Sequence, residues 1–174
     1  LQAAPLQSIT LNTVAGDTFS GLTANRELFS FAVCFADGTL IETPDGPRPV
    51  QNLAVGDLVT TMDRGAQPIR WIGGREVAAR GAMQPVQIAP GALGPNLPSR
   101  PLLLSRHHRV LVRSRVAERM FGSAEALVAA HKLVGLPGIA LDTSRRTVGY
   151  WHFMCDRHEV VFADGAPAET LYLG

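Results

Sequence analysis

Cys34 stands out among the residues that could do chemistry, because the chain around it suits attack on a carbonyl. It follows the apolar Val33 and precedes a turn-forming Asp37-Gly38 pair and a run typical of a strand. A thiol attacks as its thiolate, which is scarce at neutral pH when the pKa is near its ordinary value of about 8.5. Intramolecular attack on the preceding peptide compensates, since effective molarities then reach roughly 10⁵–10⁸ M. We interpret Cys34 as a nucleophile toward the Val33 carbonyl, with a buried core cysteine as the alternative.

A second group of candidates lies in the run Ser105-Arg106-His107-His108, between two apolar segments. Breaking an amide requires a proton for the leaving nitrogen and stabilisation of the oxyanion. We expect His108 to protonate the amide nitrogen of Cys34 and Ser105 to hold a carbonyl or the histidine in place. The alternative is that the two histidines are polar residues at the end of a strand.

A third group lies near the end of the chain, where His152 and His158 flank a short polar turn. Either histidine could be the general base that takes the thiol proton, because imidazole titrates near neutral pH. Asp156 in the same turn has a plainer interpretation, in which it pairs with Arg157 or caps His158.

Metal and cofactor sites have little support in the sequence. Cys155-x-x-His158 has the spacing of zinc ligands, but structural zinc needs four ligands and only one half of such a site is present. The glycine-rich segments lack the patterns that bind nucleotides. We expect no metal and no cofactor.

The composition limits the classes of partner. The chain has 174 residues, 46% of them hydrophobic and 18% charged, with a net charge of +1. This gives no electrostatic reason to expect binding to nucleic acid or to an anionic membrane surface, and no apolar run is long enough to span a membrane. Two cysteines do not form a disulfide framework, so the compartment stays open, secretion included. We expect a monomer.

The spacing of prolines and glycines along the chain predicts many short strands. Twelve prolines and seventeen glycines are spread throughout. A helix is predicted for 123–134, with Ser123 as its N-cap and Gly135 as its stop. Strands are predicted at 8–14, 39–43, 49–53, 58–61, 68–73, 86–88, 102–104, 109–112, 150–154 and 159–163.

Four motifs in this order resemble those of the Hint superfamily, the hedgehog and intein autoprocessing domains. Residues 34–41 match the motif that begins with the splicing nucleophile, and 50–59 match the hydrophobic-x-Gly-Asp motif that follows it. Ser105-x-x-His108 is similar to the Thr-x-x-His motif, and 158–165 resemble the motif in which a histidine precedes a strand and a turn glycine. The chain looks most like the bacterial intein-like domains without a homing endonuclease.

The resemblance covers 34–170 and implies an all-β, flat, horseshoe-like fold with one short helix and with the termini close together. It divides the chain into an upstream flank at 1–33 and a Hint-type domain at 34–174. The partner that it implies is the protein's own upstream polypeptide.

The chemistry that the resemblance implies is an N-to-S acyl shift, in which Cys34 converts the Val33–Cys34 amide to a thioester. His108 would activate the amide and Ser105 would assist it. His152 falls where inteins often have Asp or Cys.

The chain departs from inteins at Glu169-Thr170, which stands where inteins end in His-Asn. Without that asparagine there is no cyclisation, so we expect N-terminal cleavage by water or a small nucleophile, without splicing. Two alternatives stay open: an inactive Hint fold that acts as a structural or interaction module, and a Cys/His hydrolase that acts on other molecules.

Overall fold

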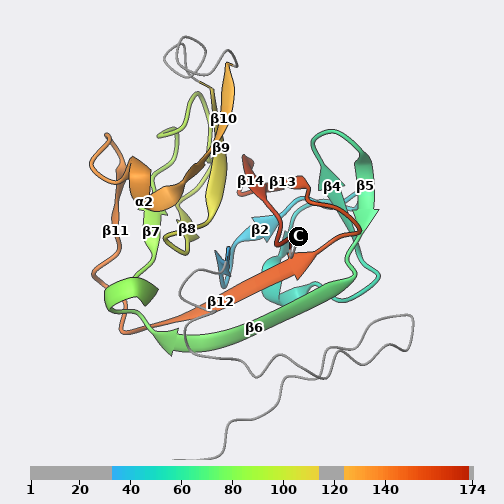
Figure 1. The fold of residues 1–174 in the computed structure, drawn as a ribbon, viewed down its shortest axis with the longest axis horizontal. Coiled ribbons are helices and arrows are strands. Elements are labelled where there is room, and N and C mark those ends of the chain that lie inside the picture. The colour runs from blue at the N-terminus through green and yellow to red at the C-terminus, as the bar shows by residue number, and fades with distance from the viewer. Residues whose placement is uncertain (1–32, 114–123, 173–174) are drawn as a thin grey trace, which may run out of the picture.

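The computed structural model describes residues 33–113 and 124–172. Their fold is all-β, with strands arranged as an open horseshoe whose base is a long two-stranded ribbon (Figure 1), as the resemblance implied. The described helical segments are short: the α-helix α2 (Ala130–Leu133) and the 3₁₀ turns Val50–Asn52 and Gly81–Met83.

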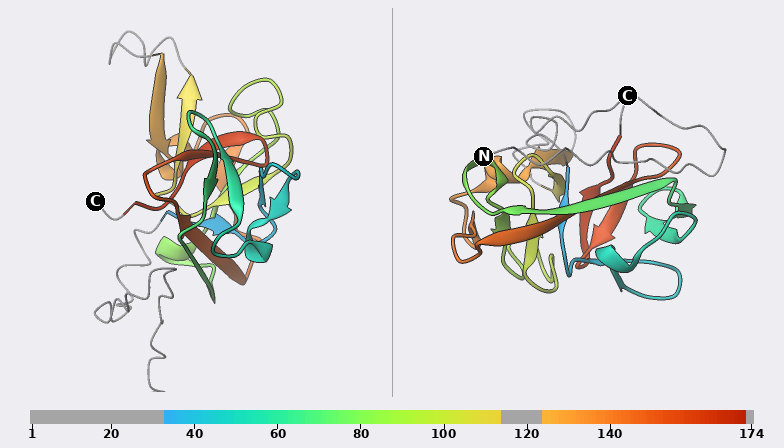
Figure 2. Two further views of the ribbon diagram at one scale, coloured as in Figure 1. Left: turned by 90° about the vertical axis from the view of Figure 1, so that its right-hand side faces the viewer. Right: turned by 90° about the horizontal axis from the view of Figure 1, so that it is seen from below.

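Six strands form the first sheet. Its longest pair, β6 and β12, runs antiparallel along the base of the horseshoe, and the two strands lie side by side in both views of Figure 2. This sheet holds the candidate nucleophile, because β1 begins directly after Cys34. The strand order is β11 (Ile139–Leu141), β7 (Val86–Ile88), β8 (Leu102–Leu104), β1 (Phe35–Ala36), β12 (Thr147–Met154) and β6 (Trp71–Ala78).

Eight strands form the second sheet, and it too is antiparallel. A branch of two strands, β4 (Leu58–Thr61) and β5 (Gly65–Pro68), joins it through β13. The main path runs β10 (Glu125–Ala129), β9 (Arg109–Arg113), β14 (Ala166–Glu169), β13 (Val160–Ala163), β2 (Leu40–Ile41) and β3 (Arg48–Pro49).

A tight hairpin joins β13 to β14 and fixes the last part of the chain. Asp164 and Gly165 form its two-residue loop, with φ of 48° and 82°. Positive φ at both positions suits a primed turn, for which Asp-Gly is a preferred pair. The resulting register places Glu169 opposite Val160. An acidic side chain thereby comes close to His158.

Phe35, the residue after the candidate nucleophile, belongs to the hydrophobic core. Phe35 is 1% exposed and stacks on Phe153, with 5.7 Å between ring centroids. Its ring also contacts that of His108, at a centroid distance of 4.4 Å. Aromatic packing of this kind holds β1, β12 and the turn before β9 as one unit.

The helix predicted at 123–134 is wrong over most of its length. Residues 125–129 form strand β10, and only 130–133 are helical. β10 pairs with β9 along its whole length, Leu127 opposite Leu111. Pairing with a neighbouring strand outweighs the modest helix propensity of a segment this short. Ser123 lies outside the described residues.

Other predicted strands are present with changed ends. The segment predicted at 49–53 has a strand only at its start and continues as a 3₁₀ turn. The one predicted at 68–73 is interrupted at Ile69 and Arg70, where β5 ends and β6 has not begun. Strands β1, β11 and β14, and most of β5, were not predicted. The predicted strand 8–14, within the flank 1–33, lies outside the described residues.

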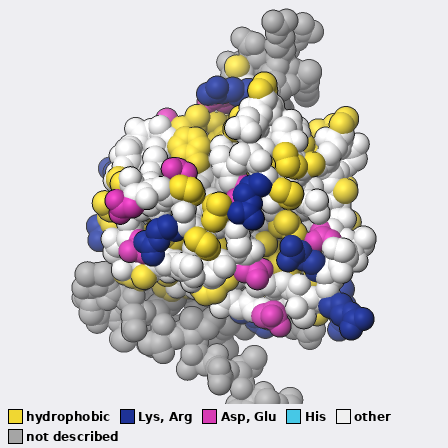
Figure 3. Space-filling model, turned by 180° about the vertical axis from the view of Figure 1, so that it is seen from behind, with side chains coloured by type: hydrophobic (Ala, Val, Ile, Leu, Met, Phe, Trp, Pro, Cys, Tyr) yellow, Lys and Arg dark blue, Asp and Glu magenta, His cyan; other side chains and the backbone are white. Residues whose placement is uncertain are grey.

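The molecular surface mixes charges of both signs. On the face in Figure 3, cationic and anionic side chains alternate with hydrophobic ones, and neither sign gathers over a large area. Within the parts of the chain described here, no helix is both long and apolar enough to cross a bilayer.

Candidate active site

The strand register places Cys34 between two other candidate residues. β1 pairs with β12 through Phe35 and Trp151, and with β8 through Phe35 and Leu104. In antiparallel pairs, the residue before Phe35 faces the residue that follows each of these partners. Those residues are His152 and Ser105. Ser105, which is 71 positions from Cys34 in the sequence, therefore meets its backbone. His152, which is 118 positions away, meets its thiol.

The hydrogen bonds around Cys34 are short. Its amide N–H donates to Oγ of Ser105 over 2.9 Å, and its carbonyl accepts from the Ser105 N–H over 3.0 Å. Its Sγ lies 3.2 Å from Nδ1 of His152. Ser105 was expected to hold a carbonyl or the histidine, and its hydroxyl accepts from the amide nitrogen of the Val33–Cys34 peptide.

The thiol and its histidine are both neutral at pH 7. Burial raises the pKa of Cys34 to about 12, and a hydrogen bond with the Ser105 hydroxyl lowers it only in part. Burial also lowers the pKa of His152 to about 4, assisted by the nearby His108. The pair is therefore a thiol beside an imidazole rather than a preformed thiolate–imidazolium pair. Proton transfer from the thiol to His152 would leave both groups in the charged forms that burial disfavours.

His108 is completely buried against Phe35 and beside the backbone of Cys34. Burial lowers its pKa to about 4, against the negative charge of Glu169, which raises it. Nε2 lies 3.0 Å from the carbonyl oxygen of Glu169 and must donate to it, so in the neutral ring Nδ1 carries the lone pair. Nδ1 is buried without a hydrogen-bond partner. Such a group usually costs about 1–3 kcal/mol and calls for a functional explanation.

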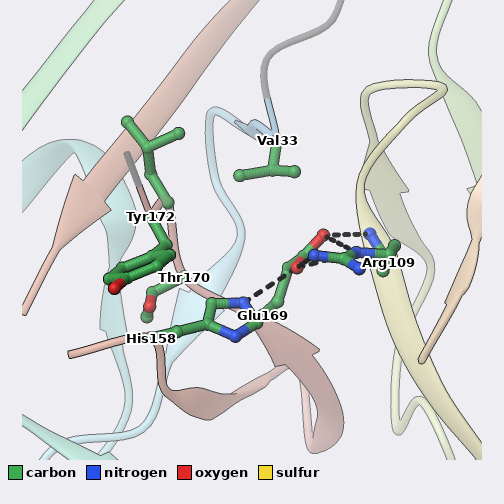
Figure 4. Close-up of a pocket in the computed structure, with 7 residues that line it drawn as sticks. Val33, Arg109, His158, Glu169, Thr170 and Tyr172 are labelled. Carbon is green, nitrogen blue, oxygen red and sulfur yellow. Dashed lines mark hydrogen bonds and ion pairs between the residues drawn. The ribbon is translucent and has the colours of Figure 1, made fainter. Parts of the chain in front are cut away.

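A pocket lies beside Val33, the residue that precedes Cys34. A cavity of about 190 Å³ is lined by Val33 together with Arg109, His158, Glu169, Thr170, Leu171 and Tyr172. Figure 4 shows Val33 across this space from His158 and Glu169. The two ends of the described chain, at Val33 and at Tyr172, thus meet at one site, as the resemblance implied.

Glu169 organises the polar wall of this pocket. Its carboxylate accepts hydrogen bonds from Nε of Arg109 over 2.8 and 2.9 Å, and from Nε2 of His158 over 2.9 Å. Burial raises its pKa, but the hydrogen bonds from Arg109 and His158 and the nearby positive charge outweigh this, so the pKa is lower than usual. Glu169 is thus an ionised carboxylate with a side chain 1% exposed.

The predicted site residues fall into two groups. Cys34, Ser105, His108 and His152 come together around the thiol. His158 does not contact the thiol and instead binds Glu169 in the pocket.

The remaining candidates have structural partners. Asp156 pairs with Arg70, through bonds of 2.8 and 2.9 Å, rather than with Arg157 or His158. Cys155 is buried and forms no disulfide with Cys34. In the described ranges no three His, Cys, Asp or Glu side chains gather as metal ligands would.

Sequence reasoning missed the roles of Glu169 and Arg109. Glu169 ends the apolar run Ala166-Pro167-Ala168, and an acidic residue there is the available signal. The contact of Glu169 with His158 depends on the hairpin at Asp164-Gly165, which the acidic residue alone does not indicate.

Comparison with known families decides the classification. The model of the Hint domain family matches residues 33–174. The chain belongs to the Hint domain family. No curated protein matches it.

Solved structures agree with this fold for the Hint domain. It is similar to the bacterial intein-like domain from Clostridium thermocellum, at 18% identity and a TM-score of 0.56, over 79% of this chain and 98% of that one. It is also similar to a splice-inactive variant of the AceL NrdHF class 3 split intein, at 10% identity and a TM-score of 0.53, over 81% and 99% of the two chains. At these identities the likeness concerns the fold alone.

Proposed function

We propose that this Hint domain cleaves its own chain between Val33 and Cys34 through a thioester. The observation that carries the proposal is the position of Cys34, whose thiol touches His152 while its own amide N–H is held by Ser105. Nucleophile, base and leaving nitrogen are thereby gathered at one peptide bond. Flank 1–33 is the segment that would be released.

The first step is an acyl shift with no net change in protons. Sγ of Cys34 bonds to the carbonyl carbon of Val33 while Nδ1 of His152 takes the thiol proton. The C–N bond then breaks, and the amide nitrogen gains one proton and becomes the free amine of Cys34. Because both partners start neutral, charge appears only in the tetrahedral intermediate, and the sulfur that carries the attack is 1% exposed.

His108 suits delivery of the proton to the leaving nitrogen. Its unpartnered Nδ1 lies in the same buried cluster, next to the backbone of Cys34. In the resting protein this Nδ1 carries the lone pair and the pKa of His108 is near 4, so His108 has first to receive the thiol proton from the nearby His152. The developing oxyanion would favour that proton on Nδ1, from which it passes to the nitrogen. Ser105 accepts from the same N–H and stabilises the nitrogen as it becomes positive.

The last part of the chain favours cleavage without splicing. Thr170 stands where an intein has its asparagine, and a hydroxyl cannot form a succinimide. Its N–H donates to the carbonyl of Glu159, and its Oγ1 accepts from the Glu159 N–H over 3.0 Å. The thioester would therefore pass to water or a small nucleophile.

A thiol tests the proposal. The full chain is incubated with and without an excess of a strong thiol and followed by intact-mass spectrometry. The expected result is a fragment ending at Val33 as a thiol ester, formed faster as thiol increases. A chain that stays intact would reject the proposal and favour the alternative of an inactive Hint fold.

A further inference from the structure

The pocket beside Val33 contains polar chemistry that thioester formation does not use. Its wall carries the chain of contacts Arg109–Glu169–His158, separate from the thiol and its histidine. His158 was a candidate base for Cys34, but its only hydrogen bond among described residues goes to Glu169. A histidine held by a buried carboxylate at an open pocket needs another explanation.

We propose that His158, oriented by Glu169, activates the water that hydrolyses the Val33 thioester. This inference rests on the proposed function, since it concerns the second half of the same reaction. His158 is the catalytic base of this step. Glu169 and Arg109 are positioning residues that act through it.

The hydrogen bond fixes which nitrogen of His158 is basic. The Glu169 carboxylate can only accept, so Nε2 of His158 carries the proton and donates over 2.9 Å. The lone pair therefore lies on Nδ1, which has no partner within the described parts of the chain. An imidazole oriented by a carboxylate in this way is a recurring arrangement for a general base.

Arg109 keeps Glu169 ionised and in place. It contacts both carboxylate oxygens from its Nε, and its Nη2 lies 2.6 Å from Oε2. The Arg109 amide N–H adds a fourth contact over 3.1 Å. Because Glu169 is almost fully buried, it would be costly as an unpaired charge.

The size and exposure of the pocket suit water. Its volume of about 190 Å³ is below the range of about 300–1,000 Å³ that pockets for drug-sized ligands occupy. The side chain of His158 is 30% exposed and that of Arg109 is 48% exposed, so solvent reaches the site. Cys34, in contrast, is 1% exposed. Among the described residues, the pocket beside Val33 is therefore more open to water than the surroundings of the thiol.

The step balances without any added reagent. Nδ1 of His158 takes one proton from water as the water oxygen bonds to the Val33 carbonyl carbon. The C–S bond breaks, and the sulfur of Cys34 receives a proton in turn. The products are a carboxylate at Val33, the regenerated thiol and one proton released to solvent.

The test separates hydrolysis from thioester formation in the full chain. His158→Gln keeps a polar side chain and loses the base. We expect it to slow spontaneous hydrolysis at Val33 about 100-fold, the lower end of general-base effects. Capture by excess thiol, which reports thioester formation, should stay within about twofold of the unmodified protein. His131→Gln, a histidine change outside the pocket, should alter neither rate.

Glu169→Gln tests the positioning role against a matched control. It should slow hydrolysis about tenfold more than it slows thiol capture, the rate equivalent of one lost hydrogen bond. Thiol capture reports separately the loss of the Glu169 charge, a charge that raises the pKa of His108. Glu125→Gln makes the same change in the other Arg–Glu pair on β9, Arg113–Glu125, and should affect neither rate.

Each outcome has one meaning. Hydrolysis at the ordinary rate in His158→Gln, or equal loss of hydrolysis and thiol capture, would overturn the inference and leave the proposed function standing. The same holds if the unmodified protein reacts with thiol but never with water. Failure of the unmodified protein to react with thiol would reject the proposed function itself.

Discussion

The two sides of the Val33–Cys34 peptide lie in opposite environments. On the sulfur side, the thiol, Ser105 and two histidines are buried, neutral and closed to water. On the acyl side, an open pocket carries an ionised Glu169 with its arginine and histidine. The difference teaches how one bond could pass through two reactions. On the proposed account, the buried side favours exchange of the amide for a thioester. The open pocket admits the water that hydrolyses this thioester.

The largest effect is expected from removing the nucleophile of the buried side. Cys34→Ala should abolish cleavage completely, with or without added thiol, because the sulfur that forms the thioester is gone. Cys155→Ala is the matched control, as it removes the other buried cysteine and should keep cleavage. Gel and mass analysis of the fragments gives the answer. Cleavage at Val33 in Cys34→Ala would end the distinction between the two sides.

Removal of the buried base comes next. His152→Gln should slow thiol-dependent cleavage by roughly 10²–10⁴-fold, the usual effect of losing a general acid or base. The rate of fragment release under saturating thiol measures this. An unchanged rate would show that the thiol loses its proton by another route, and the 3.2 Å contact would then be structural only.

Ser105→Ala is expected to have a smaller effect on the same side. It leaves the buried N–H of Cys34 without its acceptor, at a cost to stability of about 1–3 kcal/mol. The cleavage rate should fall by up to about tenfold, the equivalent of one net hydrogen bond. Denaturant unfolding and thiol-dependent cleavage measure the two effects. Ser105→Thr, which keeps the hydroxyl, should restore both, and failure to do so would assign the loss to packing.

The smallest effect is on stability and depends on pH. His108 and His152 have folded pKa values of about 4, below the unfolded value of about 6.5. The unfolded chain therefore binds more protons between pH 6.5 and 4, and the free energy of unfolding should fall as pH drops through this window, by roughly 3 kcal/mol per histidine.

Asp164 opposes this trend. Burial raises its pKa to about 6, so the folded state binds the extra proton there between pH 4 and 6. Two histidines outweigh one carboxyl, and the net slope keeps its sign. Urea unfolding at several pH values checks it, with His152→Gln expected to show a shallower slope. Stability that rises on acidification would mean that the buried side is not neutral.

The sequence was a good guide to the buried side and a poor one to the pocket. Cys34, Ser105-x-x-His108 and His152 could be named because reactive side chains in ordered motifs carry their own signal. The strands around them follow from turns such as Asp37-Gly38. The register that makes them meet arises from pairing over 71 and 118 residues, which local pattern does not encode.

The pocket depends on tertiary pairing even more. Glu169 acquires its meaning only when the β13–β14 hairpin turns it beside His158 and β9 brings Arg109 alongside. The failed helix at 123–134 has the same origin, since β9 also recruits that segment as a strand. At 125–129 and at Glu169, pairing with a neighbouring strand decided the structure, and local sequence preference did not.

Capture of the acyl group by hydroxylamine tests the central claim most directly. The full chain is treated at neutral pH, and intact-mass spectrometry follows residues 1–33 and 34–174. The account predicts that the upstream fragment appears with a hydroxamic acid at Val33, and that Cys34→Ala gives none. An uncleaved chain, or a fragment that also forms in Cys34→Ala, would contradict a thioester between Val33 and Cys34.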